Sequence, residues 1–237
     1  MDAKRVIVGL CLVIGCTKSE TKTEPNAKPI TSSTEPAAAS GPSMQKPAAE
    51  LDPSKWNETA PATFRAKFDT SKGTFVVEAT RDWSTHGVDR FYNLVKSGYF
   101  NDVRFFRAVK GFMAQFGIHG DGAVNALWRT NNIKDDAPKQ SNKRGYVSFA
   151  KSIVQHSRST QLFISYGDNS KLDEMGFAPI GKVNEEGMKV VDSLCTDYGD
   201  APPQGNGPDQ GRLQAEGNIY LKASFPKLDY VKVARIE

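Results

Sequence analysis

The sequence predicts a mainly β fold, either a closed barrel or a sandwich, with helical caps. Short runs of alternating apolar residues recur from about residue 62 to the end of the chain, and turn residues separate them. Only two segments carry apolar residues at helical spacing. Many short strands with few helices are typical of barrels and sandwiches, in which each strand buries at least one face.

The first two strands are predicted to form a hairpin. Two runs alternate between apolar and polar residues on either side of a Ser-Lys-Gly turn at 71–73. A period of two residues is typical of a strand with one buried face, and a short glycine-containing break joins such strands. The alternating residues are Phe64, Ala66 and Phe68 before the turn and Phe75 and Val77 after it.

The remaining elements are two helices and six strand-like runs. The first helix is predicted to end at Gly98, because apolar residues precede it at the helical spacing i, i+3, i+4, i+7: Val88, Phe91, Tyr92 and Val95. The second helix is predicted to begin after Asn184 as its N-cap, with two glutamates in its first turn and Gly199 beyond its end. The strand-like runs are 104–109, 112–116, 146–149, 161–166, 220–223 and 229–236.

The N-terminal sixteen residues are typical of an export signal. Lys4 and Arg5 precede an apolar stretch at 6–15, which is shorter than the roughly twenty residues that a spanning helix needs. The stretch ends in Gly15-Cys16 and resembles a bacterial lipobox, which implies a signal peptide at 1–15 and a lipidated Cys16. An uncleaved anchor, or a secretory peptide cut elsewhere, is the alternative.

A polar segment follows the predicted lipidation site. Residues 16–60 are rich in Pro, Ala, Ser and Thr and poor in large apolar residues, so we expect a disordered tether there and a folded domain at 61–237. The lipid would hold the domain in the cell envelope, on the periplasmic side of a membrane. Thr17 stands where an Asp often signals retention at the inner membrane, which favours the outer membrane.

Composition and motifs argue against several functional classes. The net charge of +4 is small and dispersed, so we expect no nucleic-acid partner. The sequence contains no phosphate-binding loop, nucleophile elbow or Cys/His metal motif, and we expect no metal or other cofactor. The Gly-rich stretch 205–211 lacks the Lys-Ser/Thr of a phosphate loop and is interpreted as a flexible surface loop.

One apolar block carries two unexpected polar residues. Within 105–117, Arg107 shares a strand face with Phe105 and Val109, and Gln115 shares one with Met113. A cation and an amide among apolar side chains suit a peptide group next to an apolar ring. The alternative is an edge strand whose arginine reaches out to water.

This block resembles the cyclophilin signature, in which F-x-R is followed five residues later by F-M-x-Q and glycine. Further cyclophilin-like motifs follow in the family's order, at 147–150, 159–164 and 172–183. The resemblance, to a bacterial cyclophilin-type peptidyl-prolyl cis-trans isomerase, extends from about residue 64 to residue 236. It implies a closed eight-stranded antiparallel β-barrel with two capping helices, and isomerisation of X-Pro peptide bonds without a cofactor.

The resemblance also implies a site. Arg107 would be the catalytic cation, Gln115 and Gln161 would hold the substrate backbone, and Ala150 would line the floor of the groove. Lys151 departs from the family, where an Asn often follows the groove alanine. The pocket for the proline ring would be formed by Phe112, Met113, Phe163, Leu172 and Phe177.

Two other functions use the same residues. The domain could be a binding or chaperone module for Pro-containing segments with little catalysis, or a structural lipoprotein with a vestigial pocket. For the isomerase, we expect Pro-containing segments of exported or envelope proteins as substrates. We also expect a membrane contact through Cys16, and a monomer.

Overall fold

The computed structural model describes residues 46–237. The predicted signal peptide, Cys16 and most of the predicted tether lie outside these residues. Within 46–237, no helix combines the length and the apolar character that crossing a bilayer requires.

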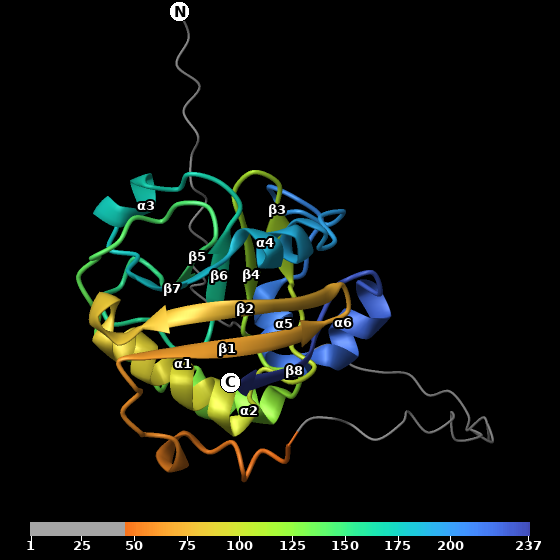
Figure 1. The fold of residues 1–237 in the computed structure, drawn as a ribbon. Coiled ribbons are helices and arrows are strands. Elements are labelled where there is room, and N and C mark those ends of the chain that lie inside the picture. The colour runs from red at the N-terminus through yellow and green to blue at the C-terminus, as the bar shows by residue number, and fades with distance from the viewer. Residues whose placement is uncertain (1–45) are drawn as a thin grey trace, which may run out of the picture. The chain divides into compact units, whose positions relative to one another are not determined.

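A single antiparallel sheet of eight strands forms the framework (Figure 1). Its strand order is β3-β4-β6-β5-β7-β2-β1-β8. Strands distant in sequence are therefore neighbours, and β4 lies between β3 and β6. The strands are β1 (Thr63–Thr70), β2 (Gly73–Thr80), β3 (Arg107–Val109), β4 (Met113–Phe116), β5 (Tyr146–Phe149), β6 (Leu162–Ser165), β7 (Pro179–Val183) and β8 (Val231–Ile236).

The expected closed barrel is wrong, because the sheet is an open, strongly curled half-barrel. Its edge strands β3 and β8 do not pair with each other. The segments that precede them share one isolated bridge, between Arg104 and Tyr230. A closing ladder needs several consecutive residue pairs, whereas β3 is only three residues long.

The described chain contains six α-helices, four more than the sequence predicted. The helix ending at Gly98 is confirmed as α1, and Gly98 adopts the left-handed conformation (φ 78°) that ends many helices. Asn184 caps α4 as predicted, accepting a hydrogen bond from Gly187 N at 2.8 Å. The helices are α1 (Thr85–Ser97), α2 (Gly122–Trp128), α3 (Lys171–Glu174), α4 (Glu185–Asp192), α5 (Gln210–Glu216) and α6 (Asn218–Ser224).

The predicted strand at 220–223 is wrong, since these residues lie in α6. Tyr220 and Leu221 are adjacent and both buried, which fits a helix face but not the alternation of a one-sided strand. They pack in a small cluster with Phe106 and Leu213. A strand there would have no partner, because neither α5 before it nor the turn after it offers a sheet edge.

The main core lies between the curled sheet and α1, and Phe68 of β1 is at its centre. Its ring stacks on Phe75 of β2 with centroids 5.1 Å apart, and on Phe91 of α1 at 6.2 Å. It also meets Phe116 of β4 edge-on at 5.9 Å. The strand that carries Gln115 is thereby fixed against the first hairpin.

The predicted tether extended to residue 60, yet the chain already packs on the domain well before that point. Leu51 is fully buried, and its carbonyl accepts a hydrogen bond from Trp128 Nε1 at 2.6 Å. Glu58 exchanges hydrogen bonds with the side chain of Asn93 on α1. The segment contains few apolar residues, but Leu51 joins the core, which composition alone does not reveal.

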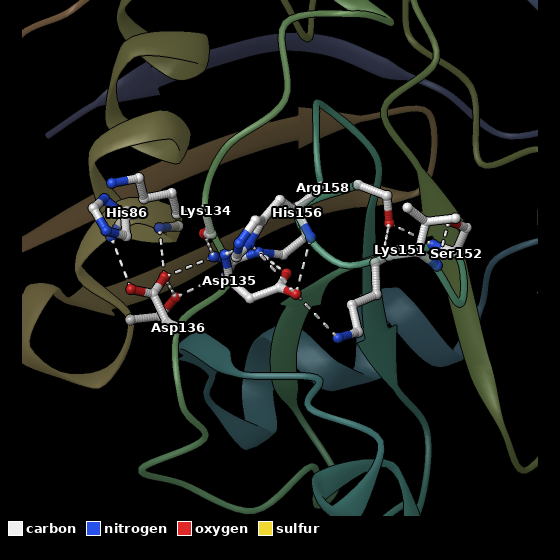
Figure 2. A network of polar contacts seen from close by, with 12 residues as sticks. His86, Lys134, Asp135, Asp136, Lys151, Ser152, His156 and Arg158 are labelled. Atoms are coloured by element: carbon white, nitrogen blue, oxygen red, sulfur yellow. Dashed lines mark hydrogen bonds and ion pairs between the residues drawn. The ribbon is translucent and has the colours of Figure 1, made fainter.

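One acidic residue and a buried arginine fix the start of α1 (Figure 2). Asp136 accepts hydrogen bonds from Ser84 Oγ at 2.6 Å and from Gly87 N at 3.0 Å, in the first turn of the helix. Arg158, only 1% exposed, donates to Asp136 Oδ2 at 2.9 Å. Burial alone would raise the pKa of Asp136, but the hydrogen bonds from Ser84, Arg158 and the helix backbone lower it overall. Asp136 is therefore charged at neutral pH.

We expect Leu51→Ala to lower the free energy of unfolding by about 2–5 kcal/mol, the usual range for truncating a buried leucine. Leu127→Ala is the matched control, because Leu127 is 40% exposed and its truncation should cost less than about 1 kcal/mol. Urea unfolding of both variants measures the difference. Equal effects would show that residue 51 does not belong to the core.

We expect Asp136→Asn to destabilise the fold by about 1.5–3 kcal/mol at pH 7, because the buried Arg158 guanidinium then keeps only one of its two carboxylate partners. A carboxylate with a lowered pKa stabilises the fold above its unfolded pKa of 3.8 and loses this contribution as the pH falls through the folded value. The difference between wild type and variant should therefore shrink below about pH 4. Asp82→Asn, at an exposed ion pair, is the control in the same urea titrations. A pH-independent difference would contradict the assignment.

Candidate active site

The β3–β4 hairpin builds the centre of the site. The strands join at Lys110-Gly111, and Gly111 has a positive φ of 73° that suits glycine. Their register places Arg107 opposite Gln115 and Val109 opposite Met113. On its other side β4 pairs with β6, where Phe163 lies opposite Gln115. The cation, the amide and an apolar ring are therefore in one row across three strands.

Hydrogen bonds connect three of the predicted polar residues in series. Arg107 Nη1 donates to Gln115 Oε1 at 3.0 Å, and Gln115 Nε2 donates to Gln161 Oε1 at 2.9 Å. Gln115 is 6% exposed, so its amide needs both partners. We call this series the Arg107–Gln115–Gln161 relay. It fixes which end of each amide faces which neighbour.

Apolar side chains surround the relay. Met113 and Phe163 are 2% and 4% exposed, and Phe177 meets Phe163 edge-on with centroids 5.8 Å apart. Phe112 lies at the hairpin turn, with its ring centroid 5.9 Å from Arg107 Cζ. Leu172, at the start of α3, accepts a backbone hydrogen bond from Phe177 N.

Ala150 follows β5 and joins the site through the backbone. Its N–H donates to the carbonyl of Gln161 at 2.9 Å. The nine residues named from the sequence thus lie on β3, β4, β6 and α3 and in the segments that adjoin β4, β5, β6 and β7. The catalytic and binding roles given to them remain predictions.

Asp200 is a site residue that the sequence did not reveal. Arg107 donates to it through two atoms, Nε to Oδ1 at 2.7 Å and Nη2 to Oδ2 at 2.8 Å. Burial by itself would raise the pKa of Asp200, but the hydrogen bond and positive charge of Arg107 outweigh it and lower the pKa. The two residues are 93 positions apart, so no local motif could have linked them.

A second charged group braces the segment after Ala150 (Figure 2). Lys151 Nζ lies 3.5 Å from Asp135 Oδ2, and Asp135 also contacts the buried Arg158 at 3.4 Å. Lys151 Nζ lies over the ring of Phe177, 5.8 Å from its centroid. The lysine that departs from the family pattern therefore holds the 150–158 loop against the predicted proline pocket.

The acidic and imidazole groups described here form no metal centre. Within residues 46–237, no three His, Cys, Asp or Glu side chains are arranged so that they could hold a metal ion. The chemistry available at the site consists of hydrogen-bond donors, one fixed cation and apolar contact. Such a set can bind and polarise a peptide group, and it contains no activated nucleophile.

Comparison with known proteins agrees with this geometry. Peptidyl-prolyl cis-trans isomerase A of Dickeya dadantii is 33% identical over 131 residues, which cover 53% of this chain and 67% of that protein. Peptidyl-prolyl cis-trans isomerase B of Escherichia coli is 29% identical over 135 residues, covering 54% and 81%. The chain spans only 24% of a longer relative, peptidyl-prolyl cis-trans isomerase-like 2 of Neurospora crassa, at 28% identity.

A solved structure and a family profile extend the comparison. The crystal structure of a cyclophilin-type isomerase from Cryptosporidium parvum superposes with a TM-score of 0.54 at 18% identity, covering 74% of this chain and 98% of that one, and shows that the fold is shared. The profile described as "Cyclophilin type peptidyl-prolyl cis-trans isomerase/CLD" matches residues 65–208. The chain belongs to the cyclophilin-type peptidyl-prolyl cis-trans isomerase family.

Proposed function

We propose that this chain accelerates rotation about X-Pro peptide bonds and that Arg107 is the cation that assists it. The observation that carries the proposal is the Arg107–Gln115–Gln161 relay beside the buried side chains of Met113 and Phe163. The peptide bond resists rotation with a barrier of about 18–20 kcal/mol, and X-Pro isomerisation takes tens of seconds or more unaided. Millisecond turnover requires a reduction of roughly 6–7 kcal/mol.

Arg107 contributes a fixed donor. Twisting the peptide bond localises a lone pair on the prolyl nitrogen, and a donor directed at that atom stabilises the twisted state more than either planar state. The contacts with Gln115 and Asp200 use three of the five guanidinium N–H groups, which leaves two for a substrate. One charge-assisted hydrogen bond contributes about 1.5–3 kcal/mol, so Arg107 supplies only part of the reduction.

The amides and apolar side chains supply the rest. Because Gln161 Oε1 accepts from Gln115, the Gln161 NH2 group is the end that remains to donate to a substrate carbonyl. The predicted pocket residues would grip the proline ring while the preceding carbonyl swings, in a site with little water. A structure of the Cryptosporidium parvum relative obtained in the presence of the dipeptide Ala-Pro supports this class of ligand.

A binding or chaperone module with little catalysis is the second candidate. The Arg107–Asp200 ion pair favours it, because a carboxylate next to the cation weakens the field that Arg107 can direct at a substrate. Both candidates bind the same Pro-containing segments. They differ in whether removing the guanidinium changes the rate of isomerisation or only the affinity.

The proposed clients are exported or envelope proteins. Support comes from the export-signal pattern and from Cys16, which in a lipobox carries the acyl chains. A lipid anchor would hold the domain on the periplasmic side of a membrane, and Thr17 after the cysteine favours the outer one. The clients would then be unfolded segments of proteins close to the membrane surface.

We expect Arg107→Ala to reduce kcat/KM on an X-Pro peptide at least tenfold while the circular dichroism spectrum is unchanged. The reason is the loss of the donor to the prolyl nitrogen. Arg65→Ala is the control, since Arg65 is exposed and its ion pairs lie away from the site. Near-normal turnover by Arg107→Ala would contradict the assignment, and unchanged turnover with weakened peptide binding would support the binding module.

We expect Cys16→Ser to abolish incorporation of labelled palmitate and to move the protein from the membrane fraction to the soluble fraction of a Gram-negative host. A lipobox cysteine is acylated on its thiol, and the hydroxyl group of a serine does not replace that thiol. Cys195→Ser, which changes the cysteine of the folded domain, should keep the label. Labelling of Cys16→Ser, or no labelling of the wild type, would refute the anchor.

A further inference from the structure

We propose that Asp200 is a positioning residue that orients the Arg107 guanidinium for isomerisation. This inference rests on the proposed function of the same site. Asp200 lies in the long connection between α4 and α5, outside every motif that identified the site. Its side-chain hydrogen bonds go to Arg107 and to Ala201 N, so we infer that it acts on the substrate through the guanidinium.

The contact has the geometry of an orienting clamp. Two parallel hydrogen bonds of 2.7 and 2.8 Å, to Nε and Nη2, fix the plane of the guanidinium as well as its position. Without Asp200, the guanidinium would keep one hydrogen bond, from Nη1 to Gln115 Oε1, and could rotate about it. The clamp uses the edge formed by Nε and Nη2, so one hydrogen on Nη2 and one on Nη1 stay available.

The clamp also fixes the direction of the relay. Arg107 can only donate, so Gln115 must present Oε1 to it and Nε2 to Gln161. If the guanidinium swung away, Gln115 could flip its amide and Gln161 could follow. Asp200 therefore sets, through two intermediates, which end of Gln161 meets a substrate carbonyl.

The loop around Asp200 is built to hold this carboxylate. The Asp200 carbonyl accepts from Gly207 N at 2.8 Å, and its Oδ1 accepts from Ala201 N at 2.7 Å. A Cβ at Gly205 would lie 2.4 Å from the Asp200 carbonyl oxygen, and one at Gly207 would lie 2.8 Å from it. Gly205 and Gly207 thus allow the chain to wrap closely around Asp200, whereas Gly211, at the end of the stretch interpreted from the sequence as a flexible surface loop, lies in α5.

Anchors on both sides fix this loop to the domain. Tyr198 packs edge-on against Phe225 with centroids 5.0 Å apart, and its carbonyl accepts from Asn206 N at 3.1 Å. After the glycines, Asp209 N donates to Tyr220 Oη at 3.1 Å. The carboxylate is consequently held between two fixed points on α6 and the turn that follows it.

The opposing possibility is that Asp200 inhibits the enzyme by weakening the field of Arg107. The two possibilities predict opposite changes in turnover when Asp200 is replaced. Loss of an orienting clamp slows turnover, whereas loss of an inhibitory partner accelerates it. The two guanidinium N–H groups left available, and the fixed direction of the relay, favour the clamp.

The test uses the 237-residue chain and its variants Asp200→Asn, Asp200→Ala and Asp200→Glu. We expect Asn and Ala to reduce kcat on an X-Pro peptide five- to tenfold with KM changed less than twofold. We expect Glu, which keeps a carboxylate, to retain more activity than Asn. Asp197→Asn is the matched control, because it removes a charge from the same connection at an exposed ion pair with Lys227, and its kcat should stay within twofold.

A second readout does not depend on activity. The Arg107 Nε–H proton, hydrogen-bonded to Asp200, should exchange slowly in the NMR spectrum of the wild type and fast in Asp200→Asn, with the resonance assigned by its loss in Arg107→Lys. Unchanged or increased kcat in Asp200→Asn, or a fast-exchanging proton in the wild type, would overturn the inference. An inactive wild type, or a fully active Arg107→Ala, would instead refute the proposed function.

Discussion

The stacking of Phe68 in the concave face of the sheet is the constraint on which the architecture depends. Its ring contacts β2, α1 and β4 at once, so it fixes the curl of the sheet and the place of α1 together. A flat sheet could not bring β4 over the first hairpin, so the curl fixes where the strand that carries Gln115 lies relative to β1 and β2. The strands need not close, because residues of α1 and the aromatic rings already pack against the inner face of the sheet.

Charged groups perform a different task from the rings, since they fix loops rather than the sheet. Arg158 is almost fully buried, and two adjacent aspartates, Asp135 and Asp136, share its guanidinium. Removing a charge from water costs several kcal/mol, so such a group adds little net stability but tolerates few alternative arrangements. One aspartate extends to the start of α1 and the other to Lys151 beside Phe177. This cluster therefore supports the site at Phe177, through a segment other than the one that carries Asp200.

Sequence patterns correctly predicted the features that depend on interactions within a few residues. Alternation identified the first hairpin, and the Asn184 cap and Gly98 stop located two helices, because each signal acts within a few residues. The order of motifs also named nine residues that the fold brings to the same strands and adjoining segments. The sequence patterns did not predict three features, each of which depends on contacts between residues that are distant in the sequence. Leu51 joins the core beside Trp128, which donates a hydrogen bond to its carbonyl. Residues 220 and 221 are helical and pack in a second cluster, and β3 is too short to close the barrel.

Asp200 is the clearest case of a long-range effect, and its value is geometric more than energetic. Its side chain and that of Arg107 are 26% and 24% exposed, and partly solvated ion pairs typically add no more than about 1 kcal/mol to stability. Stability alone would thus give little reason to wrap a glycine-rich loop around one carboxylate. Catalysis gives a stronger reason, because a misplacement of about 1 Å can cost a hundredfold in rate. The direction of the hydrogen-bond donor determines how far it lowers the barrier of this reaction. A contact that adds little stability but fixes the plane of that donor therefore suits the reaction.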